Sequence, residues 1–107
     1  MKIVYRGQFT MAGRDLIRRC GYGEHYDRQA GKTSYSKHLG GAARYPRFHA
    51  YVTEYEQGFE IDLHLDQKAP VYAGASHAHN ADYDGSAVVN EVERIKTIID
   101  RHLKPKS

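Results

Sequence analysis

The sequence predicts an α+β fold, a two-layer sandwich in which two helices cover one face of an antiparallel sheet. One segment near the middle of the chain alternates apolar and polar side chains with the period of a strand. Two other segments, one on either side of it, repeat apolar side chains with the period of a helix. Packing both helices on one side of the sheet buries all of these apolar faces together. A chain of 107 residues can bury one modest core, so we expect a single domain over residues 1–107 with the order α-β-β-β-α.

The first helix is expected over residues 11–20. Thr10 is a suitable N-cap, the interior carries one apolar stripe, and Gly21 follows where helices often end in a left-handed conformation. The preceding residues 3–5 form a β-prone run so short that it predicts either a small edge strand or a lead-in to the helix.

Two hairpins are expected next, the first polar and the second apolar on one face. Residues 22–26 and 33–39 are predicted strands joined by a turn over residues 27–32. In the second hairpin, residues 47–67, a two-residue turn at residues 57–58 brings the apolar positions of both strands onto one face. The register that follows places three pairs of residues opposite each other: Val52 and Leu63, Tyr51 and His64, and His49 and Asp66.

The longest helix is expected after an irregular stretch, residues 67–85. Asp84 or Ser86 is its candidate N-cap, and Glu91 and Arg94 are expected to pair on its wet side. Its apolar stripe should pack on the apolar face of the second hairpin, because the opposite packing would bury carboxylates without partners. The expected core joins Phe48, Val52, Ile61, Leu63 and Leu65 to Val88, Val92, Ile95 and Ile99, and the expected outer face carries Tyr51, Thr53, Glu60, Asp62 and His64.

The charge of the chain is unevenly distributed. The net charge is +3, but the first fifty residues hold ten Lys and Arg against three Asp and Glu, and the remainder is acidic. A basic half is a candidate surface for a polyanion. The lone cysteine, Cys20, excludes an internal disulfide and fits a reducing compartment. Because no apolar run approaches the roughly 20 residues that span a bilayer and no secretory signal is visible, we expect a cytoplasmic protein without a membrane partner.

Tyrosines and basic residues interleave in the N-terminal half of the chain, a pattern typical of proteins that bind single-stranded nucleic acid. Basic side chains neutralise phosphates, and tyrosine rings stack on bases. The leading prediction is therefore a small nucleic-acid-binding domain with RNA as the expected ligand. Phosphate contacts are expected from Arg14, Arg18, Arg19, Arg28, Lys37, Arg44 and Arg47, and stacking from Tyr22, Tyr26, Tyr35 and Tyr45.

A second hypothesis is a metal-dependent hydrolase or nuclease. Histidine and aspartate side chains recur on the second hairpin and in the irregular stretch after it. Alternate residues of a strand share a face, so such a pair can hold one ligand, and a set of nitrogen and oxygen atoms suits zinc, manganese or iron better than calcium. The candidate ligands of a divalent metal are His64, Asp66, His77, His79 and Asp84.

Other chemistries stay open at this point. His49 or His64 could act as a general acid or base without a metal, tuned by a cross-strand neighbour. Residues 77–79 are similar to the His-hydrophobic-His signature of nicking endonucleases and relaxases, which would require a tyrosine such as Tyr22 or Tyr26 as nucleophile. A protein-interaction adaptor or toxin–antitoxin partner is a third class of function.

The predicted order of elements resembles that of double-stranded-RNA-binding domains and of HicA-type mRNA-interferase toxins. The first family carries a lysine cluster where residues 86–91 lie here, and the second carries a histidine where this chain has residues 33–35. Most of the chain from Gly21 onward also resembles small uncharacterised bacterial proteins, a likeness that implies no function. Three motifs carry that resemblance: Tyr45-Pro46-Arg47-Phe48-His49, Leu63-His64-Leu65-Asp66-Gln67-Lys68 and Tyr83-Asp84-Gly85.

Overall fold

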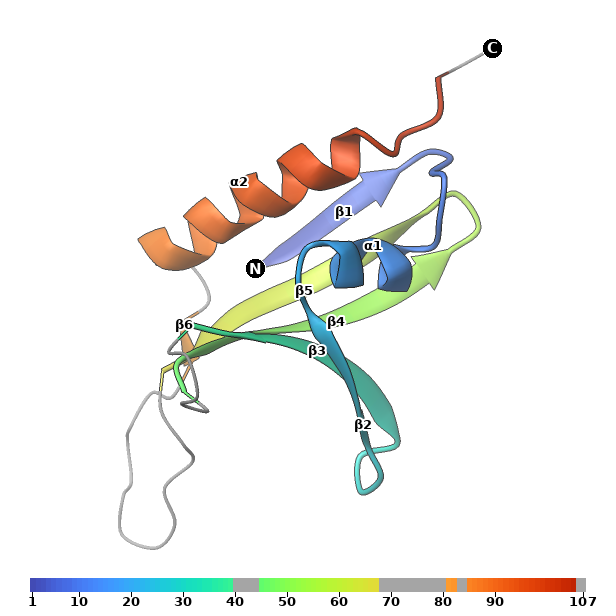
Figure 1. Ribbon diagram of the computed structural model, residues 1–107. Coiled ribbons are helices and arrows are strands. Elements are labelled where there is room, and N and C mark those ends of the chain that lie inside the picture. The colour runs from blue at the N-terminus through green and yellow to red at the C-terminus, as the bar shows by residue number, and fades with distance from the viewer. Residues whose placement is uncertain (40–44, 68–80, 83–84, 106–107) are drawn as a thin grey trace, which may run out of the picture.

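The computed structural model shows an α+β fold, in which an antiparallel sheet carries two helices (Figure 1). The structure describes residues 1–39, 45–67, 81–82 and 85–105. The strands lie in the order β1-β5-β4-β3-β2, and β6 pairs with the C-terminal end of β5. In chain order the elements are β1 (Lys2–Arg6), α1 (Gly13–Arg19), β2 (Gly23–Asp27), β3 (Lys32–His38), β4 (Arg47–Tyr55), β5 (Gly58–Asp66), β6 (Ala81–Asp82) and α2 (Ser86–Asp100).

The predicted α+β class is confirmed, but the predicted order α-β-β-β-α has three strands fewer than the structure, and β1 and β6 are among those it omits. β1 precedes α1 and pairs with β5 along its whole length. Tyr5 is the one fully buried residue of β1, so the apolar alternation that marks a central strand is weak there. β6 is two residues long, which is shorter than any sequence pattern can reveal.

The register of the central hairpin differs from the predicted one by two residues. The turn lies one residue earlier than expected, so that Tyr55 pairs with Gly58. As a result His49 lies directly opposite His64, and the predicted pairing of His49 with Asp66 is wrong. A shift of two residues leaves the same side chains on the same face, and the predicted faces therefore hold.

Gly58 explains the shift, because it serves a different purpose from the one expected of it. It is the first residue of β5 rather than part of the turn, and its φ is +131°. A β-carbon at this position would overlap the carbonyl oxygen of Tyr5 on β1. Glycine is thus required here by the close approach of the neighbouring strand.

The core lies between the helices and one face of β4 and β5. Along β5, four apolar side chains are buried and alternate with partly exposed polar ones, as predicted. The apolar stripes of both helices join this face in a continuous cluster, in which Val52 and Val92 are only partly buried. Neither helix of the described chain has the length and apolarity that crossing a bilayer requires. The buried residues that α1, β4, β5 and α2 contribute to the core cluster are Leu16, Ile17, Phe48, Ala50, Phe59, Ile61, Leu63, Leu65, Val88, Ile95 and Ile99.

The N-terminus of α1 is capped from a distant strand. The helix begins at Gly13, not at residue 11, and Thr10 is not its cap, since the Thr10 hydroxyl is hydrogen-bonded to His102 Nδ1 at 2.8 Å. The carboxylate of Glu54 on β4 instead accepts hydrogen bonds from the backbone N–H groups of Gly13 (3.0 Å) and Arg14 (2.9 Å). A carboxylate at this end also interacts favourably with the helix dipole.

Glu91 on α2 was expected on the wet side but lies in the core, 6% exposed. The Tyr22 hydroxyl donates to its Oε2 at 2.6 Å, and Arg94 donates to both of its carboxylate oxygens. Arg94 also donates to the Cys20 carbonyl oxygen at 2.7 Å. Burial alone would raise the pKa of Glu91, but the hydrogen bonds from Arg94 and Tyr22 outweigh it and hold that pKa below its usual value. The carboxylate is therefore a charged, fully partnered group that ties α2 to the end of α1.

Candidate metal centre

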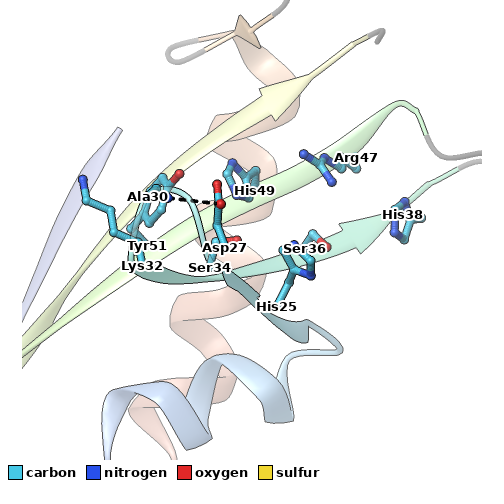
Figure 2. Close-up of a pocket in the computed structure, with 10 residues that line it drawn as sticks. All are labelled: His25, Asp27, Ala30, Lys32, Ser34, Ser36, His38, Arg47, His49 and Tyr51. Carbon is cyan, nitrogen blue, oxygen red and sulfur yellow. Dashed lines mark hydrogen bonds between the residues drawn. The ribbon is translucent and has the colours of Figure 1, made fainter. Parts of the chain in front are cut away.

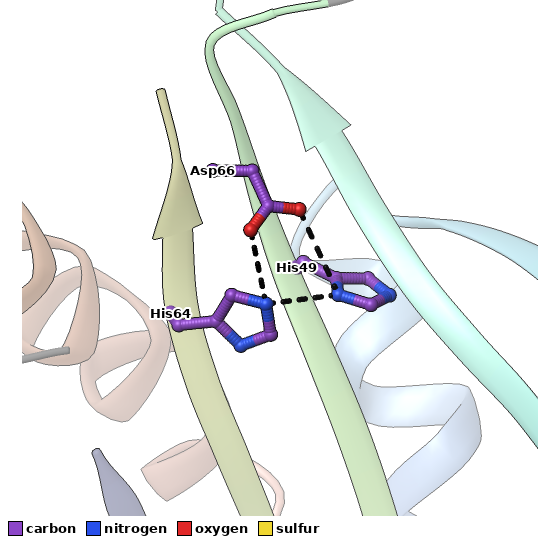
Figure 3. Close-up of side chains that lie close together, drawn as sticks. All are labelled: His49, His64 and Asp66. Carbon is purple, nitrogen blue, oxygen red and sulfur yellow. Dashed lines mark hydrogen bonds and ion pairs between the residues drawn. The ribbon is translucent and has the colours of Figure 1, made fainter. Parts of the chain in front are cut away.

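Three polar side chains meet on the face of β4 and β5 that points away from the helices (Figure 3). His49 on β4 faces His64 on β5 across the ladder. Asp66 follows His64 by two residues and so projects from the same face. We refer to His49, His64 and Asp66 as the His-His-Asp cluster.

The cluster is tight and largely shielded from solvent. His49 Nδ1 lies 3.0 Å from His64 Nε2, and His64 Nε2 lies 3.1 Å from Asp66 Oδ1. The third separation, between His49 Nδ1 and Asp66 Oδ2, is 3.9 Å. The side chains of His49, His64 and Asp66 are 13%, 12% and 16% exposed. Three potential ligand atoms thus converge on one point that a small molecule or ion can still reach.

Neighbouring side chains fix the orientation of the cluster. Arg47, opposite Asp66 in the ladder, donates from Nε to Asp66 Oδ2 at 3.2 Å. The rings of His49 and Tyr51 pack edge to face with their centroids 4.9 Å apart. Contacts of this kind from neighbouring side chains hold metal-ligand side chains in a fixed orientation.

The electrostatic surroundings favour the deprotonated forms of His49 and Asp66. Burial, followed by the nearby His64, lowers the pKa of His49 from 6.5 to about 4. Burial acts to raise the pKa of Asp66, but hydrogen bonds and charges from His64 and Arg47 prevail and lower it. At neutral pH these two groups are a neutral imidazole and a carboxylate, which are the forms that bind metals.

The dimensions of the cluster match those of a metal site. Zinc lies about 2.0 to 2.2 Å from imidazole nitrogen and carboxylate oxygen, so two ligands of one ion lie roughly 3 to 3.5 Å apart. The separations of 3.0 and 3.1 Å fit this requirement. The separation of 3.9 Å joins His49 Nδ1 to the other carboxylate oxygen, Oδ2, so the Asp66 carboxylate must rotate before a single oxygen lies at this spacing from both imidazoles. Two imidazoles and one carboxylate form the ligand set of zinc hydrolases and of iron(II) sites that keep coordination positions open.

A polar hollow adjoins the cluster (Figure 2). It has a volume of about 300 Å³ and lies over the polar faces of β2, β3 and β4. His49 is shared, being both a member of the cluster and a wall of the hollow. Other walls are formed by His25, Lys32, Ser36, His38 and Arg47.

The structure brings together part of the predicted metal site. His64 and Asp66 lie side by side as expected, whereas His77, His79 and Asp84 lie outside the described residues. His49 was missing from the predicted ligand set, although it lies directly opposite His64 and next to Asp66. The signal that could have identified it is its same-face position on the neighbouring strand.

Two of the predicted stacking tyrosines belong to the core. Tyr22 and Tyr35 are each 4% exposed, and their hydroxyls donate to Glu91 and Glu24. Neither ring is available to stack on a base, so this part of the prediction is wrong. Tyr22 is also unsuited to be a nucleophile, because burial and its hydrogen bond to Glu91 raise its pKa. The sequence pattern misled because tyrosine serves equally well as a core residue with a polar end.

The predicted phosphate contacts do not form one surface. Lys37 pairs with buried Phe48, and Arg47 pairs with His38, so Lys37 and Arg47 project from opposite faces of the sheet. Arg47 lies 5.1 Å from the Tyr45 ring centroid and is committed to Asp66. Arg44 lies outside the described part of the chain. The predicted contacts that remain exposed are Arg14, Arg18, Arg19, Tyr26 and Arg28.

The lowered pKa of His49 predicts a dependence of stability on pH. Between pH 6.5 and about 4 the unfolded chain protonates this imidazole while the folded chain does not, so folding stability falls as the pH falls. The full effect is on the order of 3 kcal/mol. Urea denaturation of the metal-free protein at pH 7 and pH 4.5 measures it. His49→Asn cannot titrate and should show a visibly flatter profile, and an unchanged profile would contradict the assignment.

The chemical capacity of this site thus resides in the His-His-Asp cluster and the hollow beside it. Neutral imidazole and ionised carboxylate are held at metal-ligand spacing by fixed neighbours. No family model, curated protein or solved structure matches this chain.

Proposed function

We propose that the protein is a divalent-metal-dependent hydrolase whose metal is held by the His-His-Asp cluster. The observation that supports this proposal is the convergence of one atom each from His49, His64 and Asp66 within 4.8 Å. Polar side chains on two neighbouring strands bring three ligand atoms together only when the strand register and the side-chain rotamers both allow it. Here both do, and Arg47 steadies the carboxylate.

Three protein ligands leave coordination positions for water and substrate, which is the arrangement of catalytic rather than structural zinc sites. A metal so bound supplies a hydroxide at neutral pH by lowering the pKa of its water to about 7. The chain contributes the ligand geometry and the adjoining hollow. Arg47 acts as a positioning residue through Asp66.

Calorimetric titration of the untagged, chelator-treated protein with zinc chloride and manganese chloride tests the metal site. We expect one ion per chain, with affinity for zinc reduced at least 100-fold in His64→Ala and Asp66→Asn, a loss of about 2.7 kcal/mol. His102→Ala is the matched control, because His102 bonds to Thr10 outside the cluster and its loss should leave the affinity unchanged. Absence of stoichiometric binding, or equal weakening in the control, would remove the proposal.

Nucleic-acid binding is a second candidate function. The observation that favours it is the presence of three exposed arginines, Arg14, Arg18 and Arg19, on the short helix α1. A cluster of guanidinium groups is suited to phosphate contacts. The contact surface we infer is smaller than the sequence predicted, because Tyr22 and Tyr35 are buried.

Fluorescence titration of labelled RNA and DNA at 50 and 200 mM salt tests this candidate. Three phosphate contacts should weaken binding roughly 20-fold to 50-fold over this range. Arg14→Ala should weaken binding and reduce the salt dependence, whereas Lys2→Ala, on the face of the sheet that points away from α1, is the control. If no nucleic acid binds at 50 mM salt, the candidate is excluded.

A further inference from the structure

We propose that the polar hollow beside the His-His-Asp cluster binds the phosphoryl group of a phosphate ester. This inference rests on the proposed metal-dependent hydrolase and names its substrate class. The hollow and the cluster share His49, so a group that occupies the hollow lies next to the metal ligands.

The walls of the hollow are rich in hydrogen-bond donors. Lys32, Arg47 and His25 provide cationic or N–H groups, and Ser34 and Ser36 provide hydroxyls. In the described part of the chain, the apolar walls are limited to Ala30 and the ring of Tyr51. A hydrophobic acyl or peptide side chain therefore finds little surface to bury against, whereas phosphate oxygens find several donors.

Among the residues that the structure describes, Asp27 is the one carboxylate that lines the hollow, and it already accepts two hydrogen bonds. Its Oδ1 accepts hydrogen bonds from the backbone N–H groups of Gln29 at 2.9 Å and Ala30 at 3.2 Å, which close the β2-β3 turn. Because the Asp27 carboxylate closes this turn, its presence beside a proposed anion site has a structural reason. Lys32 lies close to Asp27 in the β2-β3 hairpin. Its ammonium nitrogen is 5.8 Å from the centroid of the Tyr51 ring, which also lines the hollow.

The balance of charge links phosphate binding to the metal. Lys32 and Arg47 oppose Asp27 and Asp66, so these four groups of the hollow and cluster carry no net charge. A divalent cation at the cluster adds two positive charges and gives the site a net positive charge that attracts anions. Phosphate should therefore bind more tightly to the metal-loaded protein, and by reciprocity phosphate should strengthen metal binding.

The volume of about 300 Å³ is at the lower end of ligand sites and suits a phosphoryl group with a small alcohol portion. In the reaction the oxygen of the metal-activated water forms a bond to phosphorus, and the bond from phosphorus to the alcohol oxygen breaks. The departing alkoxide takes up the proton that the water has lost. The products are the alcohol and a phosphate with one ester bond fewer, so that no further reactant is required.

Calorimetric titration of the metal-free and the zinc-loaded protein with inorganic phosphate tests the inference. We expect the zinc-loaded protein to bind phosphate at least 10-fold more tightly than the metal-free protein. Lys32→Ala should weaken binding about 5-fold to 10-fold without altering zinc affinity. Lys96→Ala, at an exposed position of α2 on the other side of the sheet from the hollow, is the matched control and should leave phosphate binding unchanged.

Hydrolysis assays of the zinc-loaded protein separate the substrate classes. Bis-p-nitrophenyl phosphate or p-nitrophenyl phosphate should be hydrolysed in preference to p-nitrophenyl acetate, with an increased KM for the phosphate substrates in Lys32→Ala. Stoichiometric zinc binding without phosphate binding would overturn this inference and leave the metal centre standing. Absence of zinc binding would instead overturn the proposed function, and equal phosphate affinity with and without zinc would overturn the link between hollow and cluster.

Discussion

Replacing Gly58 with alanine is expected to reduce the free energy of unfolding by about 3 to 5 kcal/mol. Two effects add at this position. The φ of +131° is one that residues with a β-carbon rarely adopt, and the added carbon would overlap the carbonyl oxygen of Tyr5. Because that oxygen belongs to backbone, relief requires the β1-β5 ladder to open near Arg6. Urea denaturation of the purified variant measures the loss.

Gly31 provides the matched control for this substitution. It has a φ of +65° in the β2-β3 turn, and a β-carbon there would meet nothing within 4 Å. Gly31→Ala should therefore report backbone strain without the clash, at a cost of about 1 to 2 kcal/mol. Equal losses at Gly31 and Gly58 would show that the close approach of β1 contributes nothing to the requirement for glycine.

Glu91→Ala is expected to cost about 2 to 4 kcal/mol, because it leaves the buried Tyr22 hydroxyl without its acceptor and removes the charge partner of the half-buried Arg94. The Tyr22 hydroxyl, 2.6 Å from Glu91 Oε2, would face a cavity, and Arg94 would lose both of its carboxylate contacts. The pairing also positions Arg94 against the Cys20 carbonyl oxygen, so the junction of α1 and β2 should loosen. Thermal and urea denaturation both measure this loss.

Two further variants on α2 show whether the burial of Glu91 is the cause of the expected loss of stability. Glu93→Ala removes the same group from an exposed position and should change stability by no more than about 0.5 kcal/mol. Glu91→Gln keeps an acceptor for Tyr22 but removes the charge opposite Arg94, and an intermediate loss of about 1 to 3 kcal/mol is expected. If Glu91→Ala is no more harmful than Glu93→Ala, the buried network does not stabilise the fold.

The elements with strong periodicity could be predicted from sequence, and those held by distant contacts could not. The alternation along β5 identified the buried face correctly, because a strand with one wet side repeats every two residues. β1 offered one buried residue and no such repeat. The start of α1 was misplaced because its cap is Glu54, and no local rule connects Thr10 or Gly13 to that residue.

In the candidate site, the face of the sheet could be predicted from sequence, but the cross-strand register could not. The side of the sheet that carries His64 and Asp66 followed from alternation, but the partner of His64 depended on the position of the turn. One residue of difference in the turn changes every cross-strand pair, so that His49 lies opposite His64 instead of Asp66. Tyr22 and Glu91 were misjudged for a related reason, since a buried tyrosine and a buried carboxylate satisfy each other only when the tertiary fold joins them.

The cap on α1 makes the stability of this helix depend on a distant strand. An isolated helix of seven residues is far below the roughly 12 to 15 residues that are marginally stable in water. The Glu54 carboxylate that satisfies its first N–H groups is separated from Gly13 by 41 positions and reaches them only from β4. We therefore expect α1 to be stable only when β4 is in place, so that a helix near the beginning of the chain depends on a strand that comes later in the sequence.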